Sequence, residues 1–216
     1  MIRFRREHPY AQYKSDFFNK LGFDFLPGRR ILDVGCGDGV DAEIFIQEYG
    51  LKTTAADVYR HERIPRIQGL TFRKASALAL PFRNSSFDYV FAHDILHHVD
   101  EPAQRIARHL DALREFRRVC KPTGSVLVIE GNRYNPLFYP HMVRMRGHDH
   151  FRQSYFERVV RLVFPAAEFR HFEAHLYPKG FTLVGKVYET LMEALSPRAF
   201  LAYNAAVVTN PGKGRR

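Results

Sequence analysis

The feature that most constrains this chain is a short apolar run that leads into three closely spaced glycines. The run is Ile31–Val34, the glycines are Gly35, Gly37 and Gly39, and an amphipathic segment follows at residues 41–49. This order predicts a buried strand, a tight turn and a helix. Glycine has no Cβ, so the turn can adopt positive φ angles and let a ligand approach its backbone. Unpaired amides at the start of the helix favour a carboxylate or a phosphate.

Two kinds of nucleotide-like ligand are bound by such turns. The dinucleotide fingerprint G-x-G-x-x-G would place its third glycine at position 40, where this chain has Val40. The observed pattern, Asp-Val-Gly-Cys-Gly-x-Gly after two apolar residues, resembles motif I of class I S-adenosyl-L-methionine (SAM)-dependent methyltransferases with a methyltransferase type 11-like domain. The resemblance implies that SAM is the cofactor and that its amino-acid end contacts Asp33, Gly35, Cys36 and Gly37.

A second strand is predicted at residues 52–57, and it ends in an acidic residue. Asp57 lies 22 positions after Gly35. A carboxylate at this point can accept both ribose hydroxyls of a nucleoside that lies across the strand ends. The resemblance implies the same role, and an exposed strand-end acid without a ligand is the alternative.

The stretch from Ser76 to Asp88 is similar to the family segment D-A-E-A-L-P-F-x-x-x-S-F-D. It implies that Ser76 and Ala77 lie near the adenine, with Ser76 at the position where the family usually has Asp. A serine hydroxyl can still accept a hydrogen bond from the adenine amino group, but it carries no charge. A non-catalytic SAM-binding protein therefore remains an alternative.

The apolar run Phe87–His93 predicts a buried parallel strand and leads into a segment similar to the family's L-H-H. Because ligands of such sheets bind beyond the carboxyl ends of the strands, His93 and Asp94 are expected at the cofactor and His98 at the acceptor. His97 is the predicted catalytic residue, a general base if the acceptor is a hydroxyl. The alternative is that these histidines only pack.

From Glu101 the apolar spacing predicts a helix of about five turns, followed by a strand at residues 125–130. The next loop lies opposite the glycine turn, and the family draws acceptor-binding residues from it. The resemblance therefore implies substrate contacts from Glu130, Asn132 and His141.

A metal is the other possibility for the histidine-rich segment that follows. It contains His141, His148, Asp149 and His150. Hard cations prefer several oxygen ligands, and this segment offers mostly imidazole. No metal site is predicted.

The C-terminal part predicts four more elements. Ser154 and Glu157 form a capping box for a helix at residues 155–164. A strand is expected at 168–177 and a last strand at 200–209. A mostly apolar helix at 181–195 suits either contact with an apolar acceptor or packing in the core.

These elements predict an α/β fold, a Rossmann-like seven-stranded, mostly parallel sheet with helices on both faces and an antiparallel last strand. The whole chain, 1–216, is expected to form a single SAM-dependent methyltransferase domain. The resemblance implies that 1–27 is an N-terminal helix that covers the cofactor and that 131–165 is a substrate-lid insertion. Packing of the N-terminal aromatic residues on the sheet edge is an equal alternative for the first segment.

Charge and cysteine content restrict the partners. The chain of 216 residues has a formal net charge of +10, spread along its length, which favours acidic partners or an anionic membrane surface. A dedicated nucleic-acid binder would more often show a dense basic stripe. Two cysteines without metal spacing, no secretory signal and no membrane-spanning apolar stretch indicate a cytoplasmic protein; peripheral membrane contact stays open.

The predicted function is methyl transfer to a small-molecule acceptor, with a sugar, glycan or lipid-linked hydroxyl as candidates. The family's amino-methylating nucleic-acid enzymes carry [DN]-P-P-[YFW] after the fourth strand, where this chain has His93-Asp94-Ile95-Leu96. An RNA methyltransferase is therefore only an alternative. The chain is expected to be a monomer or a homodimer.

Overall fold

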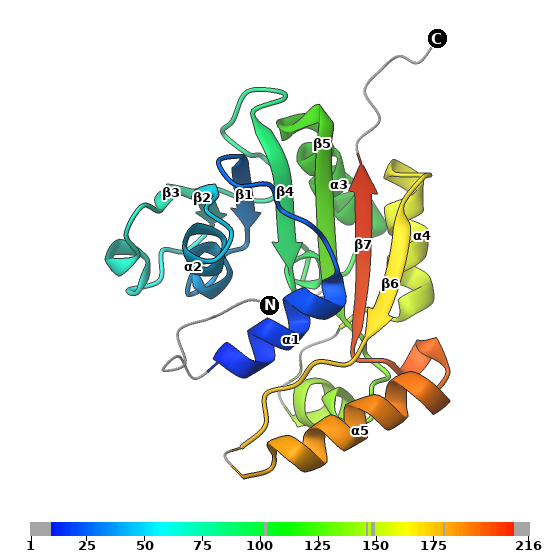
Figure 1. Ribbon diagram of the computed structural model, residues 1–216. Coiled ribbons are helices and arrows are strands. Elements are labelled where there is room, and N and C mark those ends of the chain that lie inside the picture. The colour runs from blue at the N-terminus through cyan, green and yellow to red at the C-terminus, as the bar shows by residue number, and fades with distance from the viewer. Residues whose placement is uncertain (1–9, 102, 146, 148–149, 179, 210–216) are drawn as a thin grey trace.

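The computed structural model describes residues 10–101, 103–145, 147, 150–178 and 180–209. Within these residues seven strands form one sheet in the order β3-β2-β1-β4-β5-β7-β6 (Figure 1). β7 pairs antiparallel with both of its neighbours, and the strands from β3 to β5 pair in parallel. The predicted fold class is confirmed. The strands are β1 (Arg30–Val34), β2 (Lys52–Asp57), β3 (Thr71–Lys74), β4 (Phe87–His93), β5 (Cys120–Gly131), β6 (Glu168–Phe172) and β7 (Tyr203–Thr209).

Helices cover both faces of the sheet, because successive strand residues point to opposite sides. Leu32 and Val90 pack with α3 and α4, whereas Ile31 and Phe91 pack with α1 and α2. No helix among the described residues has both the length and the apolar character needed to cross a bilayer. The helices are α1 (Ala11–Leu21), α2 (Val40–Gln47), α3 (Ile106–Val119), α4 (Gln153–Val163) and α5 (Thr182–Leu195), with 3-10 turns η1 (Ile64–Arg66), η2 (Leu96–His98) and η4 (Arg198–Phe200) and a π-helix η3 (Tyr139–Met145).

The helix expected from Glu101 begins five residues later, at Ile106. Gln104 has a left-handed backbone, with φ of 48°, which a right-handed helix cannot include. Asp100 accepts hydrogen bonds from the backbone and side-chain nitrogens of Arg105, at 2.9 and 2.8 Å. These contacts fix a turn where apolar spacing alone predicts a helix.

The predicted capping box at α4 is also wrong. The N-cap of α4 is Arg152, and no side chain caps the first turn. Ser154 lies inside that turn and is exposed. Glu157 instead accepts a hydrogen bond from Arg161 at 2.8 Å and lies 3.4 Å from His171.

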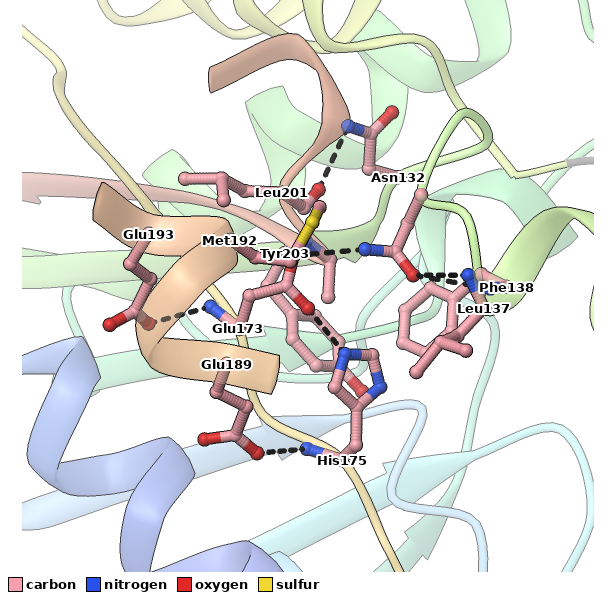
Figure 2. Close-up of polar contacts among 12 residues, drawn as sticks. Asn132, Leu137, Phe138, Glu173, His175, Glu189, Met192, Glu193, Leu201 and Tyr203 are labelled. Atoms are coloured by element: carbon pink, nitrogen blue, oxygen red, sulfur yellow. Dashed lines mark hydrogen bonds and ion pairs between the residues drawn. The ribbon is translucent and has the colours of Figure 1, made fainter. Parts of the chain in front are cut away.

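The strand expected at 168–177 ends at Phe172, because the next residues enter a buried polar network (Figure 2). The Glu173 carboxylate has no exposed surface and accepts hydrogen bonds from Asn135 Nδ2 at 2.9 Å and Ala202 N at 3.0 Å. It also pairs with His175, whose backbone N–H donates to Glu189 of α5 at 3.2 Å. The network joins the loop after β5, the end of β6 and α5.

α5 buries its polar side and exposes its apolar side. Glu189 is 1% exposed and accepts hydrogen bonds from Lys20 at 2.9 Å and Lys186 at 2.8 Å. Leu183 and Leu195 are each 78% exposed. The interpretation of this helix as plain core is therefore wrong.

The network predicts how one substitution changes the stability of the protein. Glu173→Ala removes the carboxylate that accepts hydrogen bonds from three buried donors, so we expect a loss of about 3 kcal/mol in the free energy of unfolding, measured by denaturant titration. Asp111→Ala removes a carboxylate from the solvent-facing Asp111–Arg114 pair and should cost less than about 0.5 kcal/mol. Equal losses in the two variants would contradict a structural role for the network.

Candidate active site

The glycine turn between β1 and α2 has the backbone that the sequence predicts. Gly35, Gly37 and Gly39 have φ of 71°, 50° and 81°. A Cβ on Gly35 would lie 2.5 Å from the side chain of Ile95, in the segment after β4. A Cβ on Gly37 would meet nothing within 4 Å. Gly35 therefore allows the turn to pack against Ile95. Gly37 faces open space where a ligand can approach.

Asp57, at the end of β2, faces this turn. Its Oδ2 accepts a hydrogen bond from Gly37 N at 3.0 Å, and its Oδ1 accepts one from Tyr59 N at 3.1 Å. Parallel pairing of β1 with β2 places the two strand ends side by side. The turn and the carboxylate thus lie together, as their spacing in the sequence predicts.

Negative charge is concentrated around the turn. Asp33 is 2% exposed, and its Oδ2 has no hydrogen-bond partner in the described structure. Burial raises the pKa of Asp33 well above its usual value, and the charges of Asp41, Asp57 and Asp38 add to the effect, although Lys14 opposes it. A ligand that brings positive charge would relieve this repulsion, whereas a diphosphate would increase it. The site therefore favours a cationic nucleoside over a dinucleotide.

α1 covers the carboxyl end of β4. Lys14 pairs with Asp41 at 2.6 Å, and Asp41 Oδ2 lies 2.8 Å from His93 Nδ1. The ring of Phe17 stacks on His93 with 4.4 Å between the centroids. His93 is consequently enclosed between α1 and α2 at the edge of the sheet where the turn lies.

The other residues predicted at the cofactor are mostly buried. Cys36 and Ala77 are each 8% exposed, and burial raises the pKa of the Cys36 thiol. Ser76 follows β3, and its Oγ accepts a hydrogen bond from Leu78 N at 3.2 Å. Its hydroxyl hydrogen is not used in that contact.

A second group of polar residues lies beyond β4 and β5. His97 is 1% exposed, and its Nδ1 lies 2.6 Å from Oε2 of Glu130, which has no exposed surface. The other oxygen of Glu130 accepts hydrogen bonds from Ile95 N at 3.0 Å and Leu96 N at 2.7 Å. Glu130 therefore accepts a hydrogen bond from the Nδ1–H group of His97. This contact fixes the tautomer of the neutral ring and leaves Nε2 as its basic atom.

The charges around His97 are closely coupled. Burial acts to lower the pKa of His97, but the adjacent Glu130 carboxylate outweighs it, and the pKa is raised. Ligand-type atoms of Asp94, His97, Glu130 and His150 all lie within 4.8 Å of one another. Asp94 has a left-handed backbone with φ of 52°, and its Oδ1 accepts a hydrogen bond from Gly131 N at 2.7 Å. These four side chains could hold a divalent cation, or act together as an acid–base group.

The predicted acceptor residues are distributed unevenly. Glu130 lies in this group. His98 points outward and pairs with Glu101 at 2.8 Å. Asn132 has no exposed surface, and its amide donates to the carbonyls of Ala199 and Leu201 at 2.7 and 2.9 Å. The side chain of His141 lies outside the described structure, as do His148 and Asp149.

The sequence analysis missed several residues that the fold brings to the site. Lys14 and Asp41 enclose His93, and His150 joins His97. The signal for His150 was weak, because it is one of several histidines in its segment. Asp94 was expected beside the cofactor with His93, and the structure places it in the group with His97 and Glu130.

A glycine turn with a facing acid, at the carboxyl edge of a mostly parallel sheet, defines a nucleoside-binding α/β domain. Residues 32–128 match the family model described as a methyltransferase domain. This stretch, just under half of the chain, is similar to class I methyltransferase domains, and SAM is the cofactor of that family, as the resemblance implied.

Similar proteins include two quinone methyltransferases. Demethylmenaquinone methyltransferase of Renibacterium salmoninarum is 34% identical over 142 residues, which are 63% of this chain and 50% of that protein. 2-Methyl-6-phytyl-1,4-hydroquinone methyltransferase of Synechocystis is 31% identical over 135 residues, which are 57% of this chain and 40% of that protein. The chain thus spans half or less of the length of these curated relatives.

A solved structure shares the fold over nearly the whole chain. It is phosphoethanolamine N-methyltransferase 2 of Haemonchus contortus, in complex with phosphomonomethylethanolamine and S-adenosylhomocysteine. The match has a TM-score of 0.63 at 19% identity and covers 92% of this chain and 52% of that one.

The contact between His97 and Glu130 predicts a pH-dependent property. Nuclear magnetic resonance should show that the pKa of His97 lies above about 6.5 and falls in Glu130→Gln, which keeps burial but removes the charge. Since the folded-state pKa is the higher one, the contribution of the pair to stability is complete below about pH 6.5 and is lost as the pH rises through the folded-state pKa. Asp111→Asn, in the solvent-facing pair with Arg114 on α3, is the control and should not change the His97 titration. An unchanged His97 titration in Glu130→Gln would contradict the assignment.

Proposed function

We propose that this chain binds SAM and transfers its methyl group to a small-molecule acceptor. The observation that carries the proposal is the pairing of the open glycine turn at Gly37 with the Asp57 carboxylate. The buried Asp33 oxygen without a partner and the acidic surroundings of the turn fit the ammonium and sulfonium of SAM. Asp33, Gly35, Cys36, Gly37, Asp57, Ser76, Ala77 and His93 are the proposed cofactor residues.

When bound, SAM supplies a methyl group that the sulfonium makes electrophilic. The chain must then orient the acceptor and exclude water. His97 Nε2 is the proposed base that removes a proton from an acceptor hydroxyl, and Glu130 stabilises the imidazolium that results. Asp94 and His150 border the same space. An amine or an activated carbon would need less help from a base.

The proposed acceptor is small. The relatives named above act on a menaquinone precursor and on a phytyl hydroquinone, and the solved neighbour holds a phosphorylated amine. An enclosed His97 suits an acceptor that enters a cleft. We further propose that α1 forms part of a cover over the cofactor, as its contacts with His93 suggest, and that 131–165 forms the acceptor side.

Calorimetry tests cofactor binding without knowledge of the acceptor. Wild-type protein should bind SAM, and Asp57→Ala should bind it about 10- to 100-fold more weakly, because a charged hydrogen-bond acceptor is lost. Asp111→Ala, a carboxylate far from the turn in the sequence and bonded to Arg114, should bind like wild type. NAD should not bind. Binding of NAD without SAM, or no binding of SAM at millimolar concentration, would reject the proposed function.

A further inference from the structure

A cleft on the acceptor side of the domain is positively charged. It has a volume of about 560 Å³ and is lined by residues from the segment before α3, the loop after β5 and the start of α4. Three of its eight lining residues are arginines, and none is acidic. The lining residues are Gln104, Arg133, His150, Phe151, Arg152, Ser154, Tyr155 and Arg158.

This cleft is continuous with the proposed catalytic group. His150 lines it, and the rings of His150 and His97 are 4.5 Å apart between centroids. A molecule in the cleft would therefore lie next to the group around His97. The cleft is separate from the acidic turn that favours the cationic cofactor.

Three features strengthen the cleft as a binding site. Gln104 donates its amide to the carbonyl of His97 at 2.6 Å, so its Oε1 points the other way, and that atom is buried without a hydrogen-bond partner in the described structure. Gln104 also has the left-handed backbone noted above, and such strain persists mainly where it serves a site. α4 begins at the cleft with no side-chain cap, so its first amides add positive potential.

We infer that the cleft binds the acceptor through a phosphate or carboxylate group, held by Arg133, Arg152 and Arg158. Guanidinium groups bind such anions through paired, charge-assisted hydrogen bonds. Gln104 Oε1 then accepts a hydrogen bond from a hydroxyl or amine of the same molecule. This inference rests on the proposed function, and it narrows the acceptor to small anionic molecules.

Titration with simple probes tests the cleft. In nuclear magnetic resonance titrations, inorganic phosphate and benzoate should shift signals of the cleft residues, and benzyl alcohol should not. Arg158→Gln should weaken anion binding about tenfold, since one charged donor is lost, and added salt should weaken it further. Arg114→Gln, on α3 and paired with Asp111, is the control and should bind like wild type.

The outcomes separate this inference from the proposed function. Anion binding that survives in Arg158→Gln, or equal shifts with benzyl alcohol, would overturn the anion site even if SAM binds. Anion binding that depends on Arg158, in a chain that does not bind SAM, would overturn the assignment of the cleft to a methyl acceptor. Support requires both ligands to bind and Arg158→Gln to keep its affinity for SAM.

A different observation, the exposed apolar face of α5, carries a second proposal. Leu183, Val187, Leu191 and Leu195 follow one another at four-residue spacing, and all are more than half exposed. Val184 and Phe181 extend the face and are 66% and 61% exposed. A contiguous exposed apolar surface of this kind marks an interaction site.

The ion pairs of α5 and the net charge of the whole chain indicate which partner fits. Its buried carboxylate, Glu189, is neutralised by Lys20 and Lys186, and Glu193 pairs with Lys20 at 2.7 Å. The outward face therefore offers no unpaired acid, and the chain as a whole has a net charge of +10. We propose that this face docks on a lipid bilayer that contains anionic lipids, with the leucines inserted at the headgroup boundary.

Vesicle flotation tests the membrane proposal. Wild-type protein should float with phosphatidylcholine vesicles in which roughly one lipid in three is anionic phosphatidylglycerol. The double variant Leu183→Ser and Leu191→Ser should bind about tenfold more weakly, because two apolar side chains no longer insert. Leu162→Ser, which changes a leucine on α4 that is 58% exposed, is the matched control and should float like wild type. Failure of the wild type to float, or a wild-type dimer that only the double variant disrupts, would overturn the proposal in favour of no partner or a second copy.

Discussion

One buried carboxylate, Glu130, holds the two halves of the site together. It lies at the end of β5 and accepts hydrogen bonds from two backbone amides and one histidine of the segment after β4. The same segment packs Ile95 against the glycine turn, so closely that only a glycine fits at position 35. The position of His97 relative to the turn thus depends on one fully buried charge whose hydrogen bonds are all satisfied within the fold.

Acidic and basic side chains lie on different sides of the site along the sheet. On the side of β1 and β2, Asp33, Asp41 and Asp57 surround the turn. On the side of β5 and α4, arginines line the cleft. A cationic methyl donor and an anionic acceptor would each lie where the protein carries the opposite charge. That arrangement would both attract the two proposed ligands and keep each from the other's position.

The sequence predicts what depends on local pattern. Strand β4 and the glycine turn follow from apolar runs and glycine spacing, and both agree with the structure. The start of α3 does not follow, since it depends on contacts of Asp100 that the apolar spacing does not reveal. The pairing of His97 with Glu130 joins positions 33 apart, and only the neighbouring positions of β4 and β5 create it.

The arginines of the cleft and the exposed leucines of α5 both depend on how a helix packs, and a local sequence pattern does not show this. The direction in which a helix points its side chains depends on how it packs. α4 buries Phe156 and Val160 against the sheet, which turns Arg158 toward the cleft. α5 packs instead through a buried ion-pair network with Lys20, so its polar side faces inward and its leucines face out. The sequence of α5 has the amphipathic spacing of an ordinary surface helix, and the position of a single lysine on α1 helps decide which side is hidden.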